Sequence, residues 1–124
     1  MSVIGEKQAD IEGKITSVTV RTGWSEVNVE AQLVSFGMVY GTVTFEPAVD
    51  EAQETGPVVG QGRALRGDGD VVSFSGGGTW RKSGKHRREI KHISIDANGD
   101  RIFVVDEFDF EARINTGAVY ALDS

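Results

Sequence analysis

The side chains best suited to acid–base chemistry are few and lie far apart in the chain. Of the two histidines, His86 and His92, the second shares the parity of Ile90 in a segment that alternates like a β-strand. An imidazole titrates near neutral pH, so His92 could exchange protons with an enclosed ligand. Tyr40 and Glu30 are further candidate proton donors or acceptors. The alternative for His92 is a hydrogen-bonded structural or surface histidine.

Large rings and glycines share one face of a second segment. Phe74, Gly76, Gly78 and Trp80 follow one another at a spacing of two, which places all four on the same side of a strand. Glycines beside large rings leave space for a ligand, and Trp80 would form a stacking wall. Trp24 is a further aromatic candidate for ligand contact. Strand curvature explains the same glycines equally well.

Metal and cofactor signals are weak throughout the chain. The sequence contains no Cys, which excludes thiolate ligands and disulfides. His86 and His92 would lie ~20 Å apart on one strand, too far to share a metal. The glycine triplet 76–78 is followed by strand-like sequence, whereas a phosphate loop needs a helix there. No Gly-x-Ser-x-Gly motif is present. We therefore expect no metal and no cofactor.

The elements that would position these residues are strands. Apolar and polar residues alternate with a period of two, as in 24–36, where Val27, Val29, Ala31 and Leu33 share one face. The segment 107–114 alternates most clearly. Helical periodicity is almost absent. The expected strands are 13–22, 24–36, 38–46, 58–65, 70–81, 86–95, 101–106 and 107–114.

Tight turns separate the later strands. Asp-Gly lies in 67–70, Ser-Gly in 82–85 and Asn-Gly in 97–100, and each pair suits a hairpin. The acidic stretch 47–57, which holds both prolines, is expected to be a loop or one short helical turn. Sequential hairpins favour an up-and-down topology, and closure avoids exposed sheet edges. The predicted fold is an all-β, single-domain antiparallel barrel of about eight strands over 1–124.

Charge is distributed unevenly. The net charge is −6, which disfavours nucleic acid as a partner. Residues 81–91 nevertheless carry six of the thirteen Lys and Arg residues. This basic hairpin has three interpretations: a solvated hairpin that protects a sheet edge, a partner for the acidic face of 107–111 within or between subunits, or a contact for an anion or nucleic acid.

One stretch resembles a known group of barrels. In "GQGRALRGDGDVVSFSGGGTW" (60–80), a Gly-rich strand, an Asp-Gly turn and a second Gly-rich strand end in an aromatic residue. This pattern resembles the calycin and allene oxide cyclase-like barrels, whose fold also occurs in bacterial polyketide-tailoring cyclases. The resemblance implies a small eight-stranded barrel, and some members are cofactor-free cyclases. It transfers no catalytic residue.

Two functions follow from these observations. The first is a barrel that binds a small apolar or polycyclic molecule in its lumen and acts as a cofactor-independent cyclase or isomerase. The second is a non-catalytic oligomeric protein that interacts through its charged hairpin and outer faces. A homo-oligomer is expected in either case. The N-terminal residues do not resemble a secretory signal, and no apolar run reaches the ~20 residues of a membrane helix, so we expect a cytoplasmic protein without membrane contact.

Overall fold

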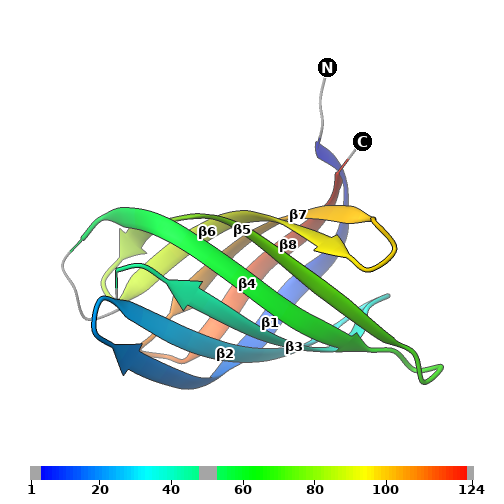
Figure 1. The fold of residues 1–124 in the computed structure, drawn as a ribbon, viewed down its shortest axis with the longest axis horizontal. Helices are drawn as coiled ribbons and strands as arrows, with labels where there is room; N and C mark the ends of the chain where they lie inside the picture. Colours follow the sequence, from blue (N-terminus) through cyan, green and yellow to red (C-terminus); the bar gives the residue numbers. More distant parts are fainter. Residues whose placement is uncertain (1–3, 48–52, 123–124) are drawn as a thin grey trace.

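Eight antiparallel strands form a closed up-and-down barrel, as predicted (Figure 1). The computed structural model describes residues 4–47 and 53–122. Each strand pairs with its neighbours in the sequence, and β1 pairs with β8 to complete the barrel. No helix in the described part of the chain is long and apolar enough to cross a membrane. The strands are β1 (Ile4–Arg21), β2 (Trp24–Leu33), β3 (Gly37–Phe45), β4 (Thr55–Leu65), β5 (Val71–Gly84), β6 (Arg87–Asp96), β7 (Arg101–Asp109) and β8 (Ile114–Leu122).

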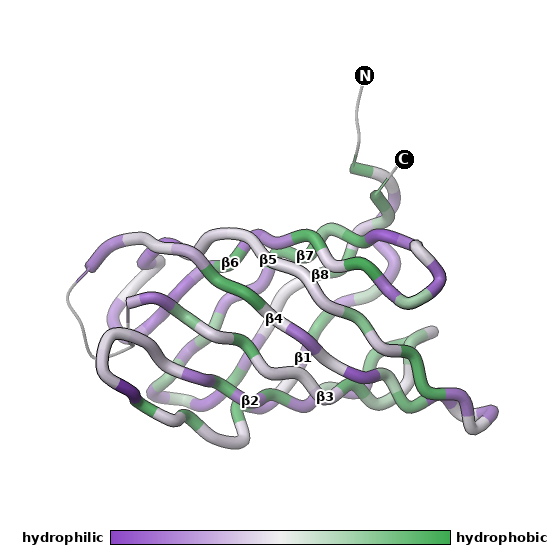
Figure 2. The backbone as a smooth tube through the Cα atoms, viewed as in Figure 1, coloured by the Kyte–Doolittle hydropathy of each residue, from purple (hydrophilic) through white to green (hydrophobic). Residues whose placement is uncertain are grey.

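The alternation seen in the sequence becomes an inner and an outer face. Along β2, Val27, Ala31 and Leu33 are buried and point inward, while the polar residues between them point outward. Figure 2 shows the same alternation of hydrophilic and hydrophobic residues along several strands. Two of the predicted hairpin turns contain glycines with positive φ, Gly69 at 96° and Gly99 at 88°.

The third predicted turn lies slightly later in the chain. β5 continues to Gly84, and the turn is made by Lys85 and His86, whose φ is 55°. The register of β5 against β6 shifts between Lys82 and Gly84, so a bulge absorbs one residue at Ser83. That bulge moves the turn beyond the Ser-Gly pair.

The prediction of one strand over 107–114 is wrong. β7 ends at Asp109, whose Oδ1 accepts hydrogen bonds from the backbone N–H groups of Glu111 and Ala112, both at 3.0 Å. This side chain closes a turn, and Arg113 completes it with a φ of 60°. The residues of 107–109 therefore continue the strand predicted at 101–106, and β8 begins at Ile114.

The predicted irregular stretch 47–57 lies only partly within the described residues, because 48–52 fall outside them. Its last residues are already regular, since β4 begins at Thr55. The strand predicted at 13–22 is also longer than expected. β1 begins at Ile4, and its first part pairs with β8.

A hydrophobic core fills one end of the barrel. Phe45 makes edge-on ring contacts with Trp80 and Phe108, at centroid distances of 6.4 and 5.4 Å. The Arg88 guanidinium lies 3.6 Å from the Trp80 ring centroid and donates a hydrogen bond to the Pro47 carbonyl. We call this end the floor; its buried apolar residues are Ile15, Val27, Phe45, Val58, Trp80, Ile90 and Phe108.

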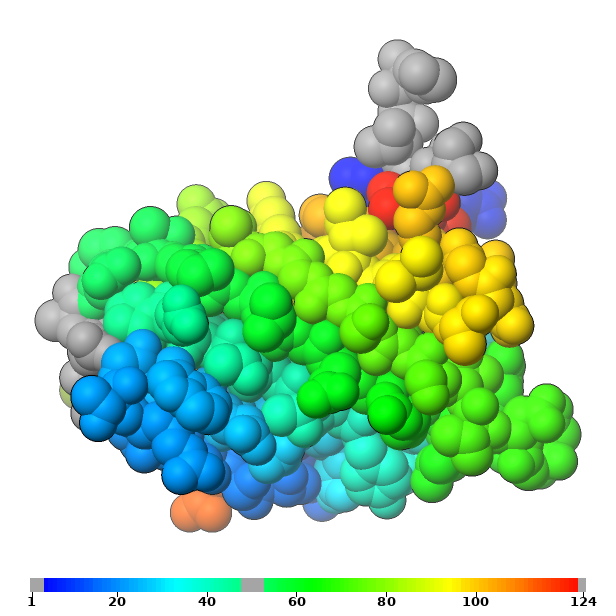
Figure 3. Space-filling view, viewed as in Figure 1, coloured from blue at the N-terminus to red at the C-terminus, as the bar shows by residue number. Residues whose placement is uncertain are grey.

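The opposite end carries the β2–β3, β4–β5 and β6–β7 turns and the two chain ends, and we call it the mouth (Figure 1). In the space-filling view the β4–β5 turn projects from this end (Figure 3). The buried cluster nearest the mouth consists of smaller side chains that line the wall: Ala9, Ile11, Ala31, Leu33, Val104 and Val119.

Inward glycines allow neighbouring strands to approach closely. Gly78 pairs directly with His92, and a Cβ on Gly78 would overlap the Lys91 carbonyl oxygen and lie 2.7 Å from the His92 Cα. Gly117 pairs with Asp106, and a Cβ there would lie 2.6 Å from the Asp106 Cα. Gly60 differs, because its nearest neighbours would be at 3.6 Å or more. The predicted role of the glycines in strand curvature is thus visible as backbone contact between strands.

This contrast predicts different effects of two alanine substitutions. Gly78→Ala should destabilise the barrel by ~2 kcal/mol or more, because backbone atoms of β6 would have to move. Gly60→Ala should change the free energy of unfolding by less than ~1 kcal/mol, because its Cβ meets only ordinary contacts. Urea denaturation of both variants measures the difference. Equal losses of stability would contradict the packing described here.

Candidate functional site

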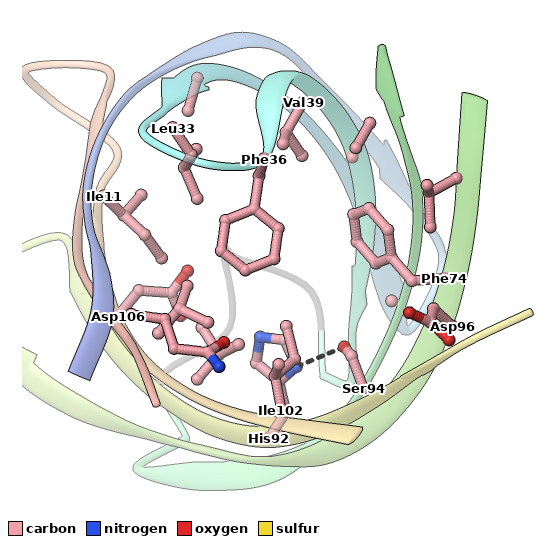
Figure 4. A pocket seen from close by; sticks show the side chains of 18 of the residues that line it. Ile11, Leu33, Phe36, Val39, Phe74, His92, Ser94, Asp96, Ile102 and Asp106 are labelled. Atoms are coloured by element: carbon pink, nitrogen blue, oxygen red, sulfur yellow. Dashed lines mark hydrogen bonds between the residues drawn. The ribbon is translucent and has the colours of Figure 1, made fainter. Parts of the chain in front are cut away.

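The barrel encloses a cavity of about 1070 Å³ between the floor and the mouth. Its lining comes from all eight strands and includes the Phe36 side chain, which projects from the β2–β3 turn into the lumen (Figure 4). The cavity is slightly larger than the ~300–1,000 Å³ typical of small-molecule sites. A lumen of this size matches the predicted ligand-binding architecture.

The two halves of the lumen differ in chemistry. The half formed by β1 to β4 is mainly apolar: its lining includes Ile11, Val29, Ala31, Leu33, Val39 and Val43, with Glu6, Lys7, Gln8 and Gln61 as its polar members. Six polar side chains of the lining come from β6 to β8: Asp96 and Arg101 beside the β6–β7 turn, and four that lie deeper. We call these four residues the polar stripe: His92, Ser94, Asp106 and Asn115.

Asp106 is the central residue of the polar stripe. It lies on β7, is only 7% exposed, and its Oδ2 accepts a 3.0 Å hydrogen bond from Asn115 Nδ2. Its Oδ1 has no hydrogen-bond partner among the described residues. Burial raises the pKa of Asp106 to about 7, and the Asn115 bond offsets only part of that effect. The carboxyl group can therefore both release and accept a proton near neutral pH.

His92 on β6 is the second titratable member. Burial lowers the pKa of His92 to about 4, so the imidazole is neutral at pH 7. Its Nδ1 lies 3.3 Å from the Ser94 Oγ, and its other ring nitrogen faces the lumen (Figure 4). When the Ser94 hydroxyl donates to Nδ1, the ring proton resides on Nε2 and is offered to the lumen.

Strand register brings these two groups together. Ile90 pairs with Asp106 and His92 pairs with Val104, so His92 and Asp106 are diagonal neighbours on adjacent strands. Such neighbours have Cβ atoms about 7–8 Å apart. One ligand atom between their side chains could therefore contact both. The site joins a proton-transferring carboxyl group with a neutral hydrogen-bond donor.

Inward glycines lie directly across from three residues of the polar stripe. Gly76 pairs with Ser94, Gly78 with His92, and Gly117 with Asp106. Each polar residue thus has an inward neighbour without a side chain on the next strand.

Only part of the predicted site lines the lumen. His92 and Phe74 do so, as predicted. Tyr40 and Glu30 pair with each other across β2 and β3, on the outer face, and Tyr40 is 47% exposed. These two residues are therefore not part of the lumen site.

The remaining predicted ligand contacts also lie elsewhere. Trp24 is at the start of β2 on the outer face, where the Arg21 guanidinium lies 5.7 Å from its ring centroid. Trp80 points inward but is buried in the floor, and its Nε1 donates a 2.8 Å hydrogen bond to the Glu46 carbonyl. Gly76 and Gly78 face inward, but backbone of β6 occupies the space beside them.

Three members of the polar stripe were missed by the sequence analysis. Asp106 has the parity of Val104 and Phe108, both buried, which marks it as an inward carboxylate. The predicted strands 101–106 and 107–114 divided β7 between residues 106 and 107, so the alternation from Val104 through Asp106 to Phe108 was not recognised. Asn115 lies on β8, most of which was not predicted as a strand, and Ser94 shares the parity of His92 but was not proposed as a site residue.

The mouth is framed by charged residues and one ring. Phe36 follows Ser35, which has a positive φ of 72°. Arg66 Nη2 donates a 2.9 Å hydrogen bond to the Ser35 carbonyl and so ties this turn to the β4–β5 turn. The charged residues of the lining are Glu6, Lys7, Arg66, Asp96, Asp100, Arg101 and the deeper Asp106.

The basic hairpin contacts acidic residues of the same chain. Arg87 lies 3.3 Å from Asp109 and 3.8 Å from Glu107, and Arg81 lies 3.1 Å from Glu89. The Ser83 hydroxyl also donates to Glu107 at 2.8 Å. These contacts agree with the interpretation of the hairpin as a partner for the acidic face of 107–111. Being largely exposed, each pair contributes little stability.

Within residues 4–47 and 53–122, no three His, Asp or Glu side chains converge closely enough to hold a metal ion. Comparison of the chain with protein-family models, with curated proteins and with solved structures gives no match. The closed eight-stranded barrel agrees with the general architecture of the calycin and allene oxide cyclase-like proteins. Membership of either group stays a prediction.

The two shifted pKa values predict opposing effects of pH on stability. Asp106 has a pKa of about 7 in the folded protein and an ordinary value of 3.8, so it lowers stability as pH rises from about 4 to 7. His92 has a pKa of about 4 in the folded protein and an ordinary value of 6.5, so it raises stability over nearly the same range. In the wild type the two effects largely cancel.

Substitution of either residue should reveal the pH dependence that the other residue contributes to stability. The stability of Asp106→Asn should rise by at most ~3 kcal/mol as pH increases from 4 to 6.5, because His92 still titrates. The stability of His92→Gln should fall by at most ~4 kcal/mol as pH increases from 4 to 7, because Asp106 still titrates. Urea denaturation at half-unit steps of pH measures both slopes. The charged residues at the mouth are common to both variants, so parallel profiles would show that Asp106 and His92 titrate normally.

Proposed function

We propose that this protein binds a small, largely apolar molecule in its lumen and catalyses proton transfer on it as a cofactor-independent isomerase or cyclase. One observation carries the proposal: Asp106, a buried carboxyl group in the lining of the cavity, has an Oδ1 without a hydrogen-bond partner among the described residues, and its diagonal neighbour is a neutral imidazole. A buried polar atom without a partner costs ~1–3 kcal/mol, and a ligand could supply the missing hydrogen bond.

Asp106 would act as the proton carrier. A general base works best when its pKa is close to the working pH, and burial places the pKa of Asp106 at about 7. Its carboxylate form would take a proton from a carbon atom of the ligand and return it to another carbon. Asn115 would hold Oδ2 through its 3.0 Å hydrogen bond and leave Oδ1 to carry the proton.

His92 would stabilise the charge that develops when the proton leaves. A neutral imidazole can donate Nε2–H to a ligand oxygen without itself losing a proton to the base. Ser94 would keep the ring in the required tautomer and orientation. The apolar half of the lumen lowers the local dielectric, which strengthens such a hydrogen bond.

The alternative, a non-catalytic interaction protein, has less support. Arg81 and Arg87 of the basic hairpin already contact carboxylates of their own chain, which reduces the charge that the hairpin offers to a partner. Association through exposed charges would also weaken with salt. Sedimentation at low and high salt tests this alternative, and a salt-sensitive oligomer would favour it.

Lumen binding can be tested with a neutral dye. Nile red should bind the wild type, and Gly60→Leu should weaken its binding at least tenfold, because Gly60 lines the cavity and has space for a side chain. Val59→Leu is the matched control, since Val59 is 58% exposed on the outer face of the same strand. Equal dye binding by both variants would place the dye outside the lumen and contradict the proposal.

Proton transfer needs its own measurement. Asp106→Asn preserves the shape of the side chain and removes the carboxylate, so it should retain dye binding and lose ~10²–10⁴-fold in proton-transfer rate. The readout is the exchange of carbon-bound hydrogen for deuterium in a bound carbon acid, followed by NMR. A rate unchanged in Asp106→Asn would show that Asp106 is not the base.

A further inference from the structure

Resting on the proposed function, we propose that the ligand is a neutral ketone whose carbonyl oxygen lies at one edge of an apolar skeleton. A free fatty acid, another carboxylate or a bare hydrocarbon would fit less well. The inference rests on three features of the lumen: its two-sided lining, the position of its charges, and the geometry of the polar stripe.

The two-sided lining requires a two-sided ligand. Ile11, Leu33 and Val39 belong to the mainly apolar half, whereas His92 and Asp106 belong to the half formed by β6 to β8 (Figure 4). A skeleton with polar atoms along one edge satisfies both halves at once. A hydrocarbon would leave Asp106 Oδ1 unpaired, which costs free energy in a buried site.

The charges of the lumen disfavour an anionic group at depth. Three cationic side chains line the cavity in the described part of the chain, and all lie toward the mouth. Lys7 is near the start of β1, Arg66 follows β4, and Arg101 is the first residue of β7. Lys7 already contacts Asp10 at 2.9 Å. A ligand carboxylate beside the polar stripe would instead meet Asp106, a like charge once Asp106 ionises.

A carboxylate placed at the mouth would leave the polar stripe without a partner. The deep end of such a ligand would then be hydrocarbon, and Asp106 Oδ1 would remain unsatisfied. A neutral ligand oxygen at the polar stripe avoids both the repulsion from ionised Asp106 and the unsatisfied hydrogen bond of Oδ1. The lumen therefore selects against carboxylates in either orientation.

The geometry of the stripe distinguishes a ketone from an alcohol. The lumen-facing nitrogen of His92 can donate to a carbonyl oxygen (Figure 4), and the carboxyl group of Asp106, the diagonal neighbour of His92, would then lie beside the neighbouring carbon. In the reaction, the C–H bond next to the carbonyl breaks and its proton forms an O–H bond on Oδ1. The electron pair moves to the carbonyl oxygen as an enolate, which His92 holds by its N–H.

The reverse transfer completes the reaction. Asp106 returns the proton to the same carbon or to a conjugated carbon further along, the enolate becomes a ketone again, and the carboxylate is restored. No oxidant, reductant or second substrate is consumed. An alcohol could make the same hydrogen bonds but has no acidic C–H group, so it would bind without reacting.

Three probes on one skeleton test this inference: 2-tetralone, which is an enolisable ketone, tetralin, which lacks oxygen, and tetralin-2-carboxylate. Affinities are measured at pH 8 by displacement of Nile red, with Gly60→Leu as the blocked lumen and Val59→Leu as the control. We expect 2-tetralone to bind at least tenfold more tightly than tetralin, and the carboxylate to bind most weakly.

Two variants assign the selectivity to the polar stripe. His92→Leu should abolish the preference for 2-tetralone over tetralin, because it removes the donor to the carbonyl oxygen. Asp106→Asn should raise the affinity for the carboxylate at least tenfold, because it removes the like charge. Ser94→Ala is a milder substitution that should reduce the ketone preference if His92→Leu does not fold. Deuterium exchange next to the carbonyl of 2-tetralone should be fast with the wild type and slow with Asp106→Asn.

The outcomes separate this inference from the function on which it rests. If all three probes bind equally and Gly60→Leu blocks them, ketone selectivity is wrong while lumen binding stands. If the carboxylate binds most tightly, the ligand is an anion and the inference is overturned. If Gly60→Leu has no effect on any probe, the lumen is not the binding site and the proposed function fails as well.

Discussion

The constraint on which the rest of the structure depends is the closure of β1 onto β8. β1 has 18 residues, and it pairs with β8 through its first part and with β2 through its second. Gly13 belongs to both pairings, opposite Ala31 on one side and Asn115 on the other. A side chain there would meet the Glu30 carbonyl oxygen at 2.9 Å. Closure removes every free sheet edge and creates an inside, which an open sheet of the same strands would lack.

The interior of the barrel has two parts: a packed floor that stabilises the fold and a cavity that holds the buried polar side chains. Large rings fill the floor, where Phe45, Trp80 and Phe108 pack almost without exposure. Smaller wall residues leave the remaining volume empty, and the buried polar groups lie there. Burial of Asp106 with one unsatisfied oxygen opposes folding, so the floor and the strand pairing must offset it. Local violations of packing rules of this kind are typical of functional sites.

Glycine residues allow the strands that carry the polar stripe to pack closely. The same residues that let β5 approach β6 and β8 approach β7 also lie directly across from the polar stripe, as Gly78 does from His92 and Gly117 from Asp106. Curvature and a cavity were alternative explanations for these glycines, and the structure supports the first, because backbone atoms of the neighbouring strand occupy the space beside them.

The sequence by itself determined the strand class, the turns at Gly69 and Gly99, the sequential topology, and which residues share a strand face with Phe74 and with His92, because a period of two separates two faces locally. It did not place residues along the barrel axis. Trp80 has the parity of Phe74 but lies in the floor, since height depends on strand tilt and register. Tyr40 and Glu30 lie on the polar faces of their strands, so the alternation itself predicts them outside, and their selection as lumen residues was wrong. Only the tertiary structure decided that Asp106, His92 and Asn115 meet, because three strands must first align in register.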